Sequence, residues 1–346
     1  MLRGVTPPDR PTIRLSSPGD MAIAIPMLLG YHPEESLVVS CIRGPAVDLT
    51  MRFDLDDLPL AADLADELAR RIEIARADVT FVAVFTDQRP GSGVLPYDAL
   101  VEQLYADGRL RVADAVLVSG RRWWAYLCSD LACCPVGGRP LDDSSEVATS
   151  LSAAFALAGS SVLAGRDELA RSIGFDVSLD AAAADRRLRR AAKRATALAQ
   201  PQRLAELRTL VDTLVERFDD PRAEATDAEV ASLAGLLHDV TARDDLLVQA
   251  VSPPRRAAIL RVLRVAVRCI PPPHDAPLCT ALAWFSYADG DGTTANIALD
   301  RALASTPDYS LALLIEASLE RQVPPHALVE VMEGAARDTG AWDAAG

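Results

Sequence analysis

The chain has 346 residues, 50% of them hydrophobic, and a formal net charge of −14 at pH 7. This length is too great for one ordinary hydrophobic core, and it predicts two domains, or one α/β domain with a helical extension. The excess of acidic residues argues against a protein that mainly coats nucleic acid or an anionic membrane, because both tasks need a basic surface.

The N-terminal segment predicts neither a signal peptide nor a membrane anchor. The apolar run that follows its arginines is short, contains Pro26 and lacks a small-residue cleavage site. No apolar run in the sequence approaches the length of a membrane span. We therefore expect a soluble cytoplasmic protein whose six cysteines are reduced thiols or metal ligands instead of disulfides.

The first half of the chain alternates strand and helix patterns. Residues 1–15, rich in Pro and Arg, predict a mobile arm, and Ser17 opens a capping box that begins a short helix ended at Gly30. Strands are expected at 37–42, 47–53, 79–85, 112–118 and 121–127, and further helices at 60–75, 97–106 and 144–158. This order predicts an α/β domain over residues 16–158, with a mixed sheet of about five strands and flanking helices.

The second half of the chain shows helical periodicity throughout, so we expect an all-helical domain over residues 159–340. Within it, residues 276–332 resemble one tetratricopeptide unit, with Cys279 at the place of the usual aromatic residue. The small and apolar residues at the matching spacings are Leu282, Ala283, Gly290, Ala295, Leu299, Ala302 and Pro307. A single repeat cannot bury its own apolar faces, so this hairpin is expected to stack on neighbouring helices.

Three stretches of the chain carry a family resemblance. Residues 25–39 contain Ile-Pro-Met-Leu-Leu-Gly-Tyr-His-Pro and Ser-Leu-Val-Val, residues 126–135 contain Tyr-Leu-Cys and Cys-Cys-Pro, and residues 290–298 contain Gly-Asp-Gly followed by Ala-Asn-Ile-Ala. With these motifs the chain resembles the actinobacterial domain of unknown function 4192, although Glu35 stands where an aspartate is expected. The resemblance implies an intracellular actinobacterial protein and implies no activity, so function has to be argued from sites.

Cys128, Cys133 and Cys134 form the most reactive cluster in the sequence. Three thiols within seven residues can provide soft ligands for zinc or act as a redox pair. His32, Cys269, His274 or Cys279 would then supply a fourth ligand. Adjacent cysteines rarely both reach one tetrahedral metal without distortion, and cysteine also packs as a small apolar residue, so structural packing is the competing interpretation.

His32 lies in the connection after the first helix, close in sequence to Glu35 and Ser36. One interpretation makes His32 a general base that Glu35 orients, acting on a ligand near the first strand. The other is that Gly30, His32 and Pro33 only build the turn.

Asp54 and Asp87 each follow a predicted strand. If those two strands are parallel, both carboxylates lie at one edge of the sheet, where ligands of α/β proteins gather, and can bind Mg²⁺ or a polar substrate. Acidic residues after strands are also common helix caps and turn formers.

Several common catalytic and nucleotide-binding motifs are missing from the sequence. Lys193 is the only lysine and does not belong to a phosphate-binding P-loop. The glycine-rich segment at residues 290–295 follows a helical pattern and not a strand, which a dinucleotide fingerprint would require. Residues 186–194 are rich in arginine but contain no aromatic residue to stack on bases, so nucleic-acid binding is not expected.

These observations favour a non-enzymatic interaction or scaffold protein that binds a protein partner through its helical half. A homo-oligomer is compatible with the same sequence. The alternative is an enzyme or small-ligand sensor with a pocket at the strand ends of the sheet. That pocket would use His32, Glu35 and the pair of Asp54 and Asp87, with zinc as a candidate cofactor at the three cysteines.

Overall fold

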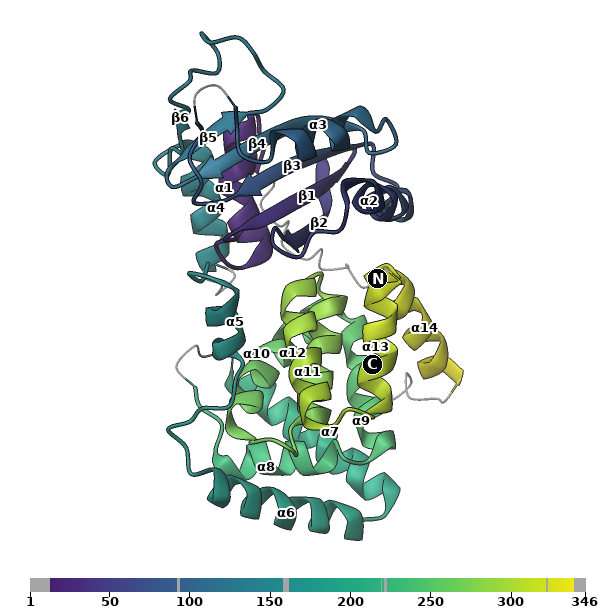
Figure 1. Cartoon of the computed structure of the whole chain (residues 1–346). Helices are drawn as coiled ribbons and strands as arrows, with labels where there is room; N and C mark the ends of the chain where they lie inside the picture. Colours follow the sequence, from purple (N-terminus) through teal and green to yellow (C-terminus); the bar gives the residue numbers. More distant parts are fainter. Residues whose placement is uncertain are drawn as a thin grey trace, which may run out of the picture. The chain divides into compact units, whose positions relative to one another are not determined.

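The computed structural model describes residues 13–91, 94–157, 162–218, 220, 223–321 and 323–338. The chain divides into two compact units, residues 1–166 and 167–346, and each is considered by itself (Figure 1). Most of the predicted N-terminal arm, and the predicted domain boundary at residue 158, lie outside the described residues.

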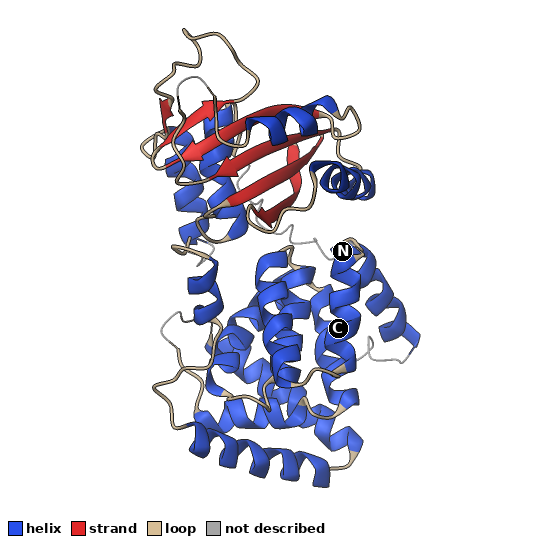
Figure 2. Cartoon of the chain, in the orientation of Figure 1, coloured by secondary structure: helices blue, strands red, loops and turns tan. Residues whose placement is uncertain are grey.

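A mixed sheet forms the centre of the first unit, which confirms the predicted α/β fold (Figure 2). Its strands are β1 (Ser36–Arg43), β2 (Ala46–Asp54), β3 (Val79–Phe85), β4 (Val112–Ser119), β5 (Arg122–Ala125) and β6 (Arg139–Pro140). The six strands lie in the order β2-β1-β3-β4-β5-β6. Strands β3 and β4 are parallel, and the other neighbouring pairs are antiparallel. The sequence predicted about five strands and missed β6.

Helices cover both faces of this sheet. They are α1 (Pro18–Leu29), α2 (Ala61–Ala75), α3 (Asp98–Ala106) and α4 (Glu146–Leu157). Helices α2 and α3 share a buried apolar cluster with alternate residues of the central strands, among them Leu37, Val82 and Leu117. Helix α1 packs against β4, β5 and α4 on the opposite face (Figure 1).

The connection from α1 into β1 has the predicted local structure. Ser17 caps α1, its hydroxyl accepts the N–H of Asp20, and the Asp20 carboxylate accepts the N–H of Ser17, which confirms the capping box. Pro26 lies inside the helix, and Gly30 ends it with a φ of 80° in the left-handed region. Tyr31 then pairs with Leu163 in an isolated parallel bridge.

All the regular secondary structure described in the second unit is helical. Its helices are α5 (Arg166–Ser172), α6 (Ala181–Ala197), α7 (Gln200–Arg217), α8 (Asp227–Leu236), α9 (Val240–Val248), α10 (Pro253–Cys269), α11 (Ala276–Ala288), α12 (Gly292–Ser305), α13 (Ser310–Glu320) and α14 (Pro325–Asp338), with one short 3-10 turn at Gln249–Val251. None of the described helices is long and apolar enough to cross a membrane.

Helices α11 and α12 form the hairpin that resembles a tetratricopeptide unit. Gly290 has a φ of 90° in the turn between them, a conformation that favours glycine. Every residue of α11 from Ala276 to Tyr287 is buried, because α9, α10, α12, α13 and α14 all pack against this helix. The first helix of the hairpin therefore lies inside the unit and has no face left for a partner.

Candidate metal centre

Strand β5 places two tryptophans beside the loop that carries the cysteines. Trp123 is buried, and Trp124 is half-buried with its Nε1 donating to the Val136 carbonyl oxygen over 2.9 Å. Gly138 has a φ of 69°, and a Cβ atom at this position would lie 2.4 Å from the Trp124 ring. Only glycine satisfies both conditions, so the end of the loop is held flat against Trp124.

One turn gathers the thiols of this loop. The Asp130 carbonyl oxygen accepts the backbone N–H groups of Cys133 and Cys134 over 3.1 and 2.6 Å, while the Asp130 carboxylate accepts the N–H of Ala132 over 2.9 Å. Arg139 Nε donates to the Cys133 carbonyl oxygen over 2.6 Å and fixes the far side of the turn. The local chain thus curls back toward Cys128.

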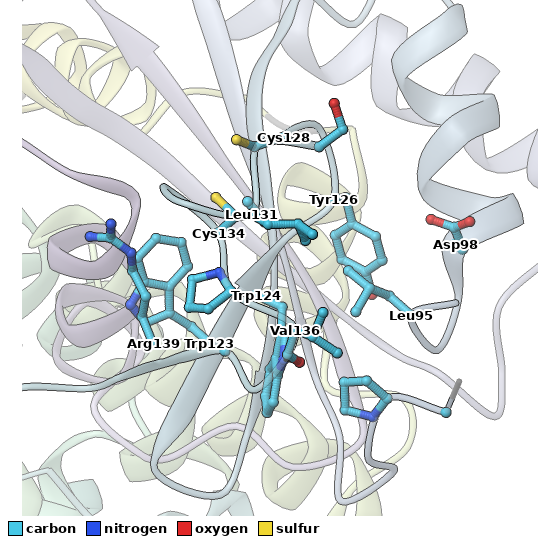
Figure 3. Close-up of a pocket in the computed structure, with 16 residues that line it drawn as sticks. Leu95, Asp98, Trp123, Trp124, Tyr126, Cys128, Leu131, Cys134, Val136 and Arg139 are labelled. Carbon is cyan, nitrogen blue, oxygen red and sulfur yellow. Dashed lines mark hydrogen bonds between the residues drawn. The ribbon is translucent and has the colours of Figure 1, made fainter. Parts of the chain in front are cut away.

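The result is a three-thiol cluster, defined as Cys128, Cys133 and Cys134. The three Sγ atoms all lie within 4.8 Å of one another. Cys133 is exposed, and Cys128 and Cys134 are partly exposed, so the cluster is open to solvent. Figure 3 shows the sulfur atoms of Cys128 and Cys134 side by side at the edge of a cleft.

The thiols differ in acidity because they hydrogen-bond to one another. The pKa of Cys128 lies below the usual thiol value, because the Cys134 thiol and the Asp130 backbone N–H donate to its sulfur, with a smaller contribution from Cys133. Burial, reinforced by the thiol pairing, raises the pKa of Cys134 to about 12. Cys128 is therefore the more acidic thiol of the pair.

Two clefts meet at the three-thiol cluster. The smaller, of about 330 Å³, has Trp123, Trp124, Leu131 and Val136 among its lining residues (Figure 3). The larger, of about 800 Å³, is lined by all three cysteines and by Asp114 of β4. Asp114 hydrogen-bonds the N–H of Ala115, but burial raises the pKa of its carboxyl group. Apolar and polar surfaces thus both adjoin the sulfur atoms.

This arrangement fits a soft divalent cation. In a tetrahedral zinc–thiolate site the Zn–S bonds are about 2.3 Å, which places the sulfurs roughly 3.8 Å apart. The sulfur atoms lie up to 4.8 Å apart, so side-chain rotations that move them by about 1 Å would bring them to this separation. The group formed by the described residues contains three ligand atoms and does not include His32, Cys269, His274 or Cys279. Three protein ligands leave one coordination position open, the arrangement typical of reactive rather than purely structural zinc sites.

The predicted carboxylate residues lie at the same end of neighbouring strands, away from the three-thiol cluster. Strands β2 and β3 both run antiparallel to β1, which lies between them, so Asp54 and Asp87 follow strand ends on the same edge. The Glu35 carboxylate lies at this edge and accepts the Thr86 hydroxyl and the Asp87 N–H, each over 2.8 Å. Glu35 holds this position with a φ of 37°, in the left-handed region.

Neighbouring polar groups at this edge are also engaged in structural hydrogen bonds. The Ser36 hydroxyl donates to the Glu34 carbonyl oxygen over 2.6 Å and accepts from Arg52 Nε over 2.8 Å. The same Arg52 binds the Asp54 carboxylate, with one N–O distance of 2.6 Å. Glu35 and Asp54 therefore have hydrogen-bonding partners other than a metal ion.

His32 stands apart from this arrangement. Its side chain is exposed, and its backbone N–H donates to the Leu163 carbonyl oxygen over 2.9 Å. The hydrogen bonds of the Glu35 carboxylate go to Thr86 and Asp87, so the structure gives no pairing of Glu35 with the His32 ring among the described contacts. The geometry places His32 in the turn that joins α1 to β1.

Residues 18–326 match the model of the family described as "Domain of unknown function (DUF4192)". The chain belongs to this family. No curated protein and no solved structure was found to be similar to it. The part of the DUF4192 chain that matches contains the sheet, the three-thiol cluster and most of the helical unit.

Several residues that shape the sites of this DUF4192 chain were not predicted. An aspartate three residues before the first of two adjacent cysteines is a local turn signal, so Asp130 could have been identified from the sequence. Thr86 and Arg52 could not have been identified from the sequence, because their roles depend on which strands lie side by side. The close contact of Gly138 with Trp124, 14 residues earlier in the chain, could not be predicted either.

The arginine-rich helix α6 of the DUF4192 chain is partly neutralised within its own unit. Arg187 pairs with Asp227 at 3.0 Å and Arg189 with Asp185 at 2.9 Å, and Arg194 contacts Glu206. Acidic residues of the protein itself therefore balance part of the positive charge of this helix.

Proposed function

We propose that this protein binds a soft divalent metal ion, zinc, through Cys128, Cys133 and Cys134, and that its α/β unit is a metal-dependent ligand-binding module. The observation that supports this most directly is the approach of the three Sγ atoms to within 4.8 Å of one another in an open loop. Bound zinc would act as a Lewis acid toward a ligand atom at its fourth position. The cleft beside Trp123 and Trp124 would hold the apolar part of that ligand.

The residues of the chain have distinct tasks in this function. The Asp130 turn holds Cys133 and Cys134 on one side of the loop, and Arg139 supports the same turn through the Cys133 carbonyl oxygen. The partly exposed Cys128 completes the ligand set. Outer contacts of this kind orient metal ligands and usually change metal affinity when removed. Metal binding also requires reduced thiols, which fits a reducing compartment such as the cytoplasm.

A scaffold role for the helical unit has weaker support. The tetratricopeptide-like hairpin offers no free face on α11, since that helix is buried among its neighbours. Leu313 and Leu314 on α13 and Val331 on α14 are exposed, but single exposed apolar residues are normal on protein surfaces. We therefore place the principal function in the α/β unit and not in capture of a protein partner.

Metal analysis of the full-length chain tests this function. Protein purified under reducing conditions without added metal is expected to contain about one zinc ion per chain, measured by inductively coupled plasma mass spectrometry. Exchange for cobalt should give the absorption bands of a tetrahedral thiolate complex. Less than about a tenth of an equivalent of zinc, with no cobalt–thiolate absorption after metal is added, would reject the proposal.

Cysteine variants identify the ligands. C128S, C133S and C134S should each lower zinc content, whereas C269S should leave it unchanged, because Cys269 lies in α10 of the helical unit and contacts the Val265 carbonyl oxygen. Circular dichroism of each variant checks that the fold is retained. Equal zinc content in C128S and C269S would place the metal elsewhere.

A further inference from the structure

The three-thiol cluster also has the geometry of a reversible oxidation site. A disulfide has an S–S length of about 2.0 Å, so sulfur atoms within 4.8 Å of one another need to approach by less than roughly 3 Å. Cys133 and Cys134 lie within the surface loop that joins β5 to β6, and the cluster is open to solvent. An oxidant therefore reaches these sulfurs without unfolding the sheet.

Local covalent geometry decides which pair can join. Cys133 and Cys134 are adjacent, and adjacent Cα atoms lie about 3.8 Å apart, below the roughly 4.4–6.8 Å of ordinary disulfides. Cys128 must therefore be one member of the bond. Cys134 is the better partner, because it lines both clefts together with Cys128, whereas Cys133 lines only the larger one and is exposed.

The remaining cysteines do not have this arrangement. Cys41 and Cys279 are buried, in β1 and α11 respectively, and the Cys279 thiol contacts the Asp275 carboxylate. Cys269 is partly buried in α10. Among the described residues, only the loop that contains Cys128 brings three metal-ligating side chains together. Oxidation should therefore be selective for that loop.

We infer that Cys128 and Cys134 form an intramolecular disulfide when the protein meets a peroxide, and that this bond releases the metal ion. This inference names a regulation of the proposed metal site and rests on that function for the release of metal. The bond between Cys128 and Cys134 stands without it.

The two-step reaction balances. The Cys128 sulfur attacks one peroxide oxygen, the O–O bond breaks, and the leaving hydroxide takes up the proton of the Cys128 thiol to become water, which gives a sulfenic acid at Cys128. The Cys134 sulfur then attacks the Cys128 sulfur, the S–S bond forms, and the S–O bond breaks. The second water carries away the Cys134 proton. Two thiols are oxidised and one peroxide is reduced to two waters.

The consequence for the metal site follows from its ligand count. A disulfide sulfur is a far weaker zinc ligand than a thiolate, because the thiolate is the form that binds metal. After oxidation Cys133 is the one thiolate left in the cluster. A single ligand cannot hold zinc against solvent, so a peroxide pulse should release the ion, and a dithiol reductant should restore the site.

The experiment uses reduced, full-length, metal-free protein treated with one equivalent of hydrogen peroxide. Thiol titration should show a loss of two thiols per chain, and peptide mass mapping should place the new bond between Cys128 and Cys134. Dithiothreitol should reverse both changes. C128S and C134S should lose no thiol pair, whereas C133S and C269S should still form the bond, and circular dichroism confirms that each variant is folded.

A bond between Cys128 and Cys133, a bond between two chains, or thiols that survive in the wild type would overturn the inference. A parallel sample loaded with zinc reports metal release through a zinc-sensitive dye. The two claims fail separately: protein that binds no zinc but forms the bond loses the proposed function and the metal release that rests on it, and keeps the disulfide. Protein that binds zinc while its thiols resist peroxide loses only the inference.

Discussion

Arg301 and Asp275 form an ion pair in the interior of the helical unit. Arg301 Nε lies 2.7 Å from Asp275 Oδ2, and the two side chains are 16% and 0% exposed. The same guanidinium donates to the carbonyl oxygens of Ile270, after α10, and Ile173, after α5. One side chain of α12 therefore ties together three other segments of the helical unit.

Removal of this guanidinium should be costly. R301L leaves the Asp275 carboxylate buried without its counter-charge, so we expect the free energy of unfolding to fall by about 3–5 kcal/mol. Urea unfolding of the full-length protein, followed by circular dichroism, measures the change. The control is R264A, because Arg264 forms a more exposed pair with Asp291 that should contribute at most about 1 kcal/mol. Similar losses of unfolding free energy in R301L and R264A would show that the buried pair contributes no more than the exposed one.

Glu35 should stabilise the α/β unit by joining β1 to the end of β3. E35A removes the acceptor of the Thr86 hydroxyl and the Asp87 N–H, and we expect a loss of about 1–3 kcal/mol. Thermal unfolding detects it as a lower melting temperature. Glu34 is exposed, so E34A is the matched control and should change stability by less than about 0.5 kcal/mol. If E35A has the same melting temperature as the wild type, this carboxylate has no structural role.

Gly138 should be required for the shape of the cleft. G138A places a methyl group against the Trp124 ring and forces alanine into a positive φ, so we expect destabilisation of about 1–3 kcal/mol and a change in tryptophan fluorescence. Because Gly138 follows the cysteine loop, zinc affinity should also fall roughly tenfold. At Gly137 an added Cβ meets no atom within 4 Å, so G137A should resemble the wild type in both measurements.

Stability of the helical unit should depend on pH through Glu229. Hydrogen bonds from Arg217, and smaller ones from Thr226, lower the pKa of Glu229 to about 2. A carboxyl group with a lower pKa in the folded protein than in the unfolded chain adds stability above the unfolded value, and that stability is lost as pH falls from about 4.5 toward 2. The contribution is present in full at neutral pH.

E229Q isolates this charge, because glutamine can still complete the capping box with Thr226. The pair is partly exposed, so the variant should be less stable by only about 1 kcal/mol at pH 7, and the difference should shrink as pH falls toward 2. Urea unfolding at both pH values checks this. E224Q, at an exposed position nearby, should show no such pH dependence.

Features set by neighbouring residues could be predicted from the sequence. The capping box at Ser17 and the strand Val79–Phe85 were predicted within a residue, because hydrogen bonds of the helix end and a run of apolar residues are local signals. Strand β6 was missed because it is two residues long and contains Pro140. Its pairing with β5 depends on the path of the intervening loop, which no periodicity records.

The candidate sites divide in the same way. Cys128, Cys133 and Cys134 lie within seven residues, so their approach could be expected from one tight turn. The contact of Glu35 with Thr86 spans 51 residues and depends on β1 lying between β2 and β3. Sequence patterns identified these three strands but not their order in the sheet, so the partner of Glu35 could not be predicted.

The burial of α11 from Ala276 to Tyr287 has a consequence for how the chain is made. Helices α9 and α14, both of which pack on α11, are separated by about 80 residues of chain, and α14 is the last described helix. During synthesis α11 leaves the ribosome well before the helix that completes its covering. Part of its apolar surface therefore stays uncovered until α14 has been made. A chain terminated before α14 would expose part of the core to aggregation or proteolysis.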